Sequence, residues 1–164
     1  MAYFSPRATW MSLMEPPDSI SFQEEGDGGS IADLEAFKVQ RDLRHRLFFH
    51  HKEWEFGPAL LEDTIRLARA QSRPEEAVTY YEEARFTAKL LVEKYGEAAY
   101  VPAWLEVNRV LSEIHNLQDE PEKSVFYARE GLLVLKKGRF DPDLDPIITK
   151  LAVRFWDLLG RMPV

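Results

Sequence analysis

The chain has 164 residues, of which 21 are basic and 28 acidic, so its formal net charge is −7. It contains no cysteine, which excludes disulfides, thiolate metal sites and cysteine nucleophiles, and its hydrophobic fraction of 45% is that of a globular protein. A net acidic chain is a poor general binder of nucleic acid, and no apolar run is long enough to span a membrane. Because no secretory signal is evident either, we expect a cytoplasmic protein.

Residues 1–30 form the first segment, which carries one Arg against five acidic residues and shows no sustained period. We interpret it as an N-terminal tail that precedes a single helical domain over residues 31–164. A disordered linker should lack large apolar side chains, yet this tail is rich in them. We therefore expect it to dock on the helices or on another chain, with Tyr3, Phe4 and Trp10 among its contact residues.

Six amphipathic helices are predicted after the tail. Proline stands near the start of most of them, where a missing N–H has no cost, and glycine follows the end of several. The predicted helices cover residues 31–55, 58–71, 74–95, 99–117, 121–137 and 146–159. No segment alternates with period two beside turn residues, so no strand is predicted. Short loops make consecutive helices antiparallel neighbours, and an all-α fold follows, either a stacked superhelix or an irregular helical bundle.

The third predicted helix presents Ala77, Tyr81 and Ala84 on one apolar face. This order of small, aromatic and small residues resembles the second helix of a tetratricopeptide repeat. A pattern similar to the first helix of that repeat occurs on the fourth predicted helix, at Trp104, Val107, Asn108 and Leu111. The resemblance covers about residues 56–138, as degenerate repeats longer than those of the family.

The resemblance implies a scaffold that binds a protein or peptide in a groove and performs no chemistry. Groove positions of the family map to Leu105, Arg109 and Ser112. The leading hypothesis is therefore a non-catalytic adaptor without a cofactor. The alternative within binding is a structural subunit or assembly factor of a larger complex, docked through its tail and last helix.

Two basic stripes suggest an acidic partner. Cations spaced three and four residues apart lie on one helical face, and the two stripes comprise Arg66, Arg69 and Arg73 on the second helix and Lys38, Arg41 and His45 on the first. If these helices pack antiparallel, the stripes border one groove that could seat an acidic segment. The alternative is an ordinary solvated face, partly neutralised by neighbouring acidic residues.

The last predicted helix carries more apolar surface than one packing face requires. Its apolar residues span about half of the helical wheel, whereas a surface helix needs a stripe of somewhat over ~100°, and the last helix of a stack should be polar outside. We expect Phe155, Trp156 and Leu159 to contact a partner. Trp156 in particular should be covered by residues 1–22 or by another chain, and self-association through this helix is one form of that cover.

Few residues suggest catalysis. His45 lies one helical turn from Asp42 and near His50 and His51, so a small metal-binding enzyme is a third hypothesis. No Glu-x2-His pair of the kind that di-metal bundles use is present, and the phosphate-binding and serine-nucleophile motifs are also missing. We expect His115 at the rim of a helix and the glutamates at 75, 76, 82 and 83 in solvent. The sequence thus predicts neither an enzyme nor a metal site.

Overall fold

The computed structural model describes residues 31–137 and 145–160, and the tail with Tyr3, Phe4 and Trp10 lies outside them. The described residues form α-helices joined by short turns, with no strand among them. The elements are α2 (Ile31–Phe49), η1 (Trp54–Phe56), α3 (Gly57–Ala70), α4 (Pro74–Glu93), η2 (Ala98–Tyr100), α5 (Val101–Leu117), α6 (Pro121–Lys137) and α7 (Asp145–Gly160). The predicted all-α class is confirmed.

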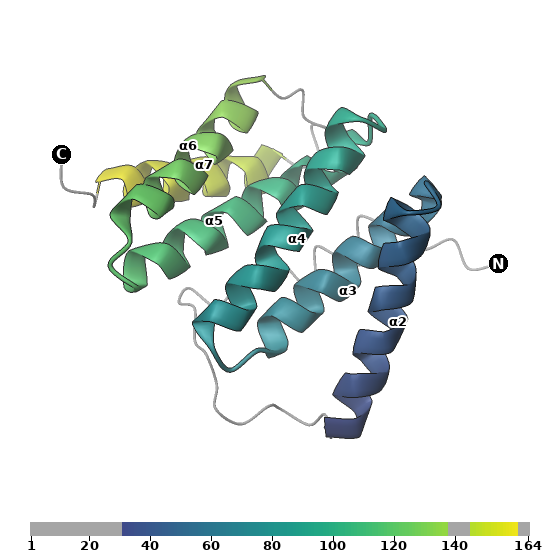
Figure 1. The fold of residues 1–164 in the computed structure, drawn as a ribbon. Coiled ribbons are helices and arrows are strands. Elements are labelled where there is room, and N and C mark those ends of the chain that lie inside the picture. Colours follow the sequence, from purple (N-terminus) through teal and green to yellow (C-terminus); the bar gives the residue numbers. More distant parts are fainter. Residues whose placement is uncertain (1–30, 138–144, 161–164) are drawn as a thin grey trace.

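The helices stack in chain order. Each α-helix packs against the next one, and α7 also packs back onto α5 (Figure 1). Helix α2 therefore forms one end of the stack, while α6 and α7 form the other. Helix α5 lies between α4 on one side and α6 and α7 on the other, and residues 101–112 are buried without interruption. This central helix is the core of the fold.

The predicted helix boundaries agree closely with the structure except at the first helix. That helix was expected to reach residue 55, but α2 ends at Phe49 because the chain turns at Lys52, which has a φ of 58° in the left-handed region. The amide of Glu53 then donates to the carbonyl of Leu47 at 3.0 Å and closes the end of the helix. At Gly96, where the sequence predicts a glycine cap, φ is 70°.

The small residues of α4 are buried as the sequence predicts. Ala77, Ala84 and Ala88 are fully inaccessible, and Tyr81 is buried between them. Burial also raises the pKa of the Tyr81 phenol to about 12. Because alanine side chains are short, the helices that flank α4 approach it closely on both sides of the Tyr81 ring. The packing of α4 therefore depends on small side chains at these positions.

Replacing Ala84 by Leu should overpack this crossing. We expect the free energy of unfolding to fall by about 1–3 kcal/mol in urea denaturation, since the added side chain has no space to occupy. The matched control is Ala70→Leu, because Ala70 is exposed at the end of α3 and should change stability by no more than about 0.5 kcal/mol. Equal stability of the two variants would contradict close packing at Ala84.

Candidate interaction surface on helices α6 and α7

Helix α7 is positioned by one aromatic ring on a glycine. The Phe155 side chain is fully buried and lies directly over Gly131 of α6. A Cβ atom at Gly131 would come within 2.3 Å of Phe155 Cζ. Only glycine therefore permits this approach of α7 to α6, and Phe155 is an internal packing residue rather than the partner contact predicted from the sequence.

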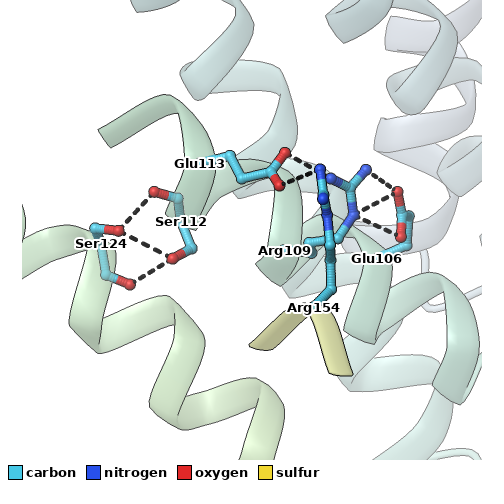
Figure 2. Close-up of polar contacts among 6 residues, drawn as sticks. All are labelled: Glu106, Arg109, Ser112, Glu113, Ser124 and Arg154. Carbon is cyan, nitrogen blue, oxygen red and sulfur yellow. Dashed lines mark hydrogen bonds and ion pairs between the residues drawn. The ribbon is translucent and has the colours of Figure 1, made fainter. Parts of the chain in front are cut away.

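An ionic network joins α7 to α5 (Figure 2). Arg154 of α7 lies 2.9 Å from Glu113, and Arg109 donates to the same carboxylate at 2.6 Å. Arg109 also donates from Nε to both oxygens of Glu106 at 3.0 Å, and its Nη2 pairs with that carboxylate too. Burial raises the pKa of Glu106, while the hydrogen bonds from Arg109 oppose that shift. These four side chains satisfy one another inside the fold.

Helices α5 and α6 are joined by a reciprocal pair of serines (Figure 2). Ser112 Oγ donates to the carbonyl of Ser124 at 2.7 Å, and Ser124 Oγ donates to the carbonyl of Ser112 at 2.7 Å. Both side chains are fully buried. The contact brings the two backbones close together, so that the inner face of α6 is fixed on α5 and its opposite face is left outward.

An open pocket lies on the outer side of α6 and α7. It has a volume of about 530 Å³ and an apolar lining with cations at its edge, and its lining residues are Arg129, Leu132, Leu133, Leu135, Lys136 and Trp156. Trp156 is 65% exposed and Leu133 is 50% exposed. Phe126 and Val153, on the same two helices, are also exposed. We call these eight residues the α6–α7 surface.

Trp156 is the sequence-predicted residue that this surface contains. Among the described residues Trp156 is mostly accessible. Residues 1–22 lie outside the described part of the chain, so cover of Trp156 by those residues or by another chain stays a prediction. Leu159 is half-buried. The α6 residues of this surface were not predicted from the sequence as contact residues. Their signal is a spacing of seven, since Phe126 and Leu133 are two turns apart, as are Arg129 and Lys136.

The groove positions implied by the repeat resemblance do not form an open site. Leu105 and Ser112 are 0% exposed and Arg109 is 4% exposed. Arg109 is occupied by Glu106 and Glu113, and Ser112 is occupied by Ser124. The prediction that these three residues line a partner groove is therefore wrong, because the fold uses their side chains to hold α5 to its neighbours.

The two predicted basic stripes do not border one groove. Arg41 is buried, donates to Thr64 Oγ1 at 3.3 Å and pairs with Glu83 of α4. Arg41 therefore stabilises the fold and is not available to a partner. Its partner Glu83 is a partly buried carboxylate in an ion pair, whereas the sequence predicted a solvated one. The second stripe remains on the surface, where Arg66 pairs with Glu62 at 2.7 Å and the side chains at 69 and 73 are exposed.

Two of the four histidines, His45 and His115, take structural positions, whereas His50 and His51 are exposed. The centroids of the His45 and Phe49 rings lie 4.6 Å apart. The pKa of His45 is lowered, mainly by burial and next by the charge of Arg41. His115 is buried and stacks on Tyr127 at 5.4 Å, so its prediction as a rim residue is wrong. Within residues 31–137 and 145–160 no group of three metal-ligating side chains is close enough to hold an ion. None of the helices in these ranges is long and apolar enough to cross a membrane.

The contact between Gly131 and the Phe155 ring should determine the position of α7 on α6. Replacing Gly131 by Ala must displace the Phe155 ring, and we expect a loss of about 1–3 kcal/mol in the free energy of unfolding. The matched control is Gly160→Ala, because a Cβ atom there meets nothing within 4 Å. That variant should stay within about 0.5 kcal/mol of the wild type. Wild-type stability of both variants would show that Phe155 does not rest on Gly131.

The buried ionic network should be far more sensitive than the surface pairs. Arg109→Met leaves the buried Glu106 carboxylate without its main partner, and such a break costs about 3–5 kcal/mol. Arg66→Met removes an exposed pair on α3 and should cost no more than about 1 kcal/mol. Chemical denaturation measures the free energy of unfolding of the two variants. Similar losses in the two variants would contradict a larger contribution of the buried network to stability.

No family model matches this chain, and comparisons with curated proteins and with solved structures find no significant match. The similarity to tetratricopeptide repeats therefore rests on the residue pattern alone.

Proposed function

We propose that this chain is a non-catalytic protein-interaction module that binds an acidic, apolar segment of a partner protein on the α6–α7 surface. The observation that carries the proposal is Trp156, a large aromatic side chain left 65% exposed at the edge of an apolar pocket. Contiguous exposed apolar surface of this kind marks interaction sites on soluble proteins. Tryptophan is also among the residues that contribute most to binding energy at protein interfaces.

The pocket has the size and chemistry of a site for apolar side chains. Its volume of about 530 Å³ lies within the range of ligand pockets, roughly 300–1,000 Å³. Covering Trp156 and Leu133 would remove apolar area from water, and a large apolar side chain contributes about 1.5–3 kcal/mol when it is fully buried. A partner that inserts two or three apolar side chains would obtain much of its affinity from this contact.

The charges around the pocket select an acidic partner. Among the described side chains of α6 and α7, the exposed cations are Lys123, Arg129, Lys136, Lys137 and Lys150, and the exposed acidic residues are Glu122 and Asp157. Over their whole length the two helices contain six basic and four acidic residues, an excess of two positive charges in a chain whose formal net charge is −7. Complementary charge raises the association rate and disfavours partners of the wrong sign.

The internal polar residues support binding rather than catalysis. Glu106, Arg109, Glu113 and Arg154 neutralise one another and hold α7 on α5, so their role in this structure is to support the surface. The proposal keeps the adaptor hypothesis but moves the site from the repeat groove to the end of the stack. A role as subunit or assembly factor uses the same surface and differs only in the permanence of the complex.

A designed peptide tests the proposal. The probe is a fluorescent helical peptide with Leu on one face and Glu on the others, and its control peptide has Lys in place of Glu. We expect the acidic peptide to bind at least about tenfold more tightly in fluorescence anisotropy, with an affinity that falls as salt is added. Trp156→Ala should weaken binding at least about tenfold, which corresponds to ~1.4 kcal/mol.

Trp54→Ala is the matched control variant. Trp54 is also exposed, but it lies on η1, which contacts α2 and α3 at the other end of the stack, and it packs against Tyr95. The Trp54→Ala variant should bind the acidic peptide with the affinity of the wild type. Equal binding of both peptides, or equal effects of the two tryptophan variants, would overturn the proposed site.

A further inference from the structure

Two cations of the α6–α7 surface are not engaged by the fold. Arg129 and Lys136 are exposed and lie seven residues apart, so both stand on the outer side of α6. On the same helix Lys123 is paired with Glu120 at 2.8 Å, whereas no ion pair between described residues involves Arg129 or Lys136. Both line the apolar pocket beside Trp156. This surface therefore has charge and apolar area to offer to an acidic, apolar segment.

A stretch of the N-terminal tail has the composition that this surface requires. Residues 10–18 read Trp-Met-Ser-Leu-Met-Glu-Pro-Pro-Asp, with four large apolar side chains, two carboxylates and no cation. The tail as a whole carries one Arg against five acidic residues, so its charge is opposite to that of α6. Apolar and acidic side chains in one short stretch match an apolar pocket with cations at its edge.

The other exposed apolar stripe of the molecule matches this stretch less well. On α2, Val39 is 69% exposed and Leu43 is 51% exposed. Most cations of α2 already have partners, since ion pairs hold Lys38, Arg41 and Arg44 and only Arg46 is exposed without one among the described residues. The α6–α7 surface therefore offers more cationic charge to a carboxylate than α2 does.

The tail is long enough to reach from α2 to the other end of the stack. The described helices begin at Ile31, and the twenty residues between Trp10 and Ile31 can extend over as much as about 70 Å. Helices α3, α4 and α5 separate α2 from α6 (Figure 1), and neighbouring helices pack about 8–10 Å apart, so the axes of α2 and α6 lie within about 40 Å. The tail and the surface can therefore meet within one chain.

We propose that residues 10–18 dock on the α6–α7 surface of their own chain and compete there with the partner protein. In this contact the apolar side chains of the stretch lie against Trp156, and the carboxylates of Glu15 and Asp18 lie beside the cations of α6. The inference rests on the proposed function, because it describes how that same surface is regulated.

Attachment to the same chain makes a weak contact effective. Segments tethered to their own site reach local concentrations on the order of 1 mM. A stretch that binds as a separate peptide with a Kd of about 0.1 mM then occupies the surface about 90% of the time, and a competing partner binds about tenfold less tightly. The tail thus sets a threshold of affinity that the partner must exceed.

A spin label on the tail tests the contact in the full chain. The protein has no cysteine and four tryptophans, so Ser12→Cys gives one attachment site and the indole N–H signals report in NMR spectra. The Trp156 signal, identified by its loss in Trp156→Phe, should lose at least about half of its intensity, because the docked state is mostly occupied at that local concentration. Trp54 is the matched control, since it is exposed at the other end of the stack and should keep its intensity.

Two further samples establish the charge dependence and the source of the tail. Glu15→Lys/Asp18→Lys in the labelled chain should restore the Trp156 signal, as should added salt. A mixture of isotope-labelled chain without the spin label and spin-labelled chain of natural isotopes should keep the full signal. Loss of the Trp156 signal in that mixture would place the tail of one copy on another and overturn docking within one chain.

Competition provides the second measurement. Trp10→Ser/Leu13→Ser removes apolar side chains from the docking stretch, and the full chain that carries it should bind the acidic peptide at least about fivefold more tightly than the wild type. The matched control is Ser19→Ala/Ser21→Ala, which changes the tail outside the stretch and should leave the affinity unchanged. Circular dichroism spectra equal to that of the wild type verify the fold of each variant.

The outcomes separate the two proposals. Equal broadening of the Trp156 and Trp54 signals, or an unchanged peptide affinity of Trp10→Ser/Leu13→Ser, overturns the tail contact. If the acidic peptide still binds through Trp156 in that case, the proposed function is retained. Failure of the peptide to bind both the wild type and Trp10→Ser/Leu13→Ser overturns the partner site and, with it, the competition.

Discussion

The close approach of α6 and α7 to α5 is the constraint on which the rest of this end of the molecule depends. Two small residues of α6, Ser124 and Gly131, make it possible and stand seven residues apart on its inner face. Ser124 exchanges hydrogen bonds with Ser112, and Gly131 accommodates the Phe155 ring. Since side chains seven residues apart share a helical face, both contacts fix the same rotation of α6. Its larger side chains, Phe126 and Leu133, must then lie outward.

The exposure of Trp156 follows from the same packing. Phe155 enters the core over Gly131, and Arg154 reaches Glu113 on α5. Successive residues of a helix point about 100° apart, so two inward residues in sequence leave the next one, Trp156, on the outer side. The indole is thus exposed because α7 is well anchored. In the proposed complex, the buried Phe155 ring and the ion pair of Arg154 with Glu113 hold the surface in place beforehand, and such preorganisation lowers the entropic cost of binding.

The sequence predicts the helices well because proline and glycine mark their ends, and it fails where a boundary or contact has no local signal. The residues around Lys52 give no sign of a left-handed backbone conformation, so the predicted first helix is longer than α2. The spacing of Arg41 cannot distinguish a solvated cation from one paired with Glu83, 42 positions away. Arg109 and Ser112 were placed in a groove by resemblance, whereas contacts from α6 and α7 bury them. Long-range packing decided the cases of Arg41, Arg109 and Ser112.

Charge segregation along the stack gives the proposed surface its selectivity. The chain carries a formal net charge of −7, yet α6 and α7 together contain six basic and four acidic residues, an excess of two positive charges. The charge of the other segments must therefore be still more negative than the total. Fields of exposed charges extend about 8 Å at physiological ionic strength, far enough to orient an approaching acidic partner toward this end. In the proposed complex, apolar contact at Trp156 stabilises the partner that these charges orient, so that specificity and affinity arise from different residues of one surface.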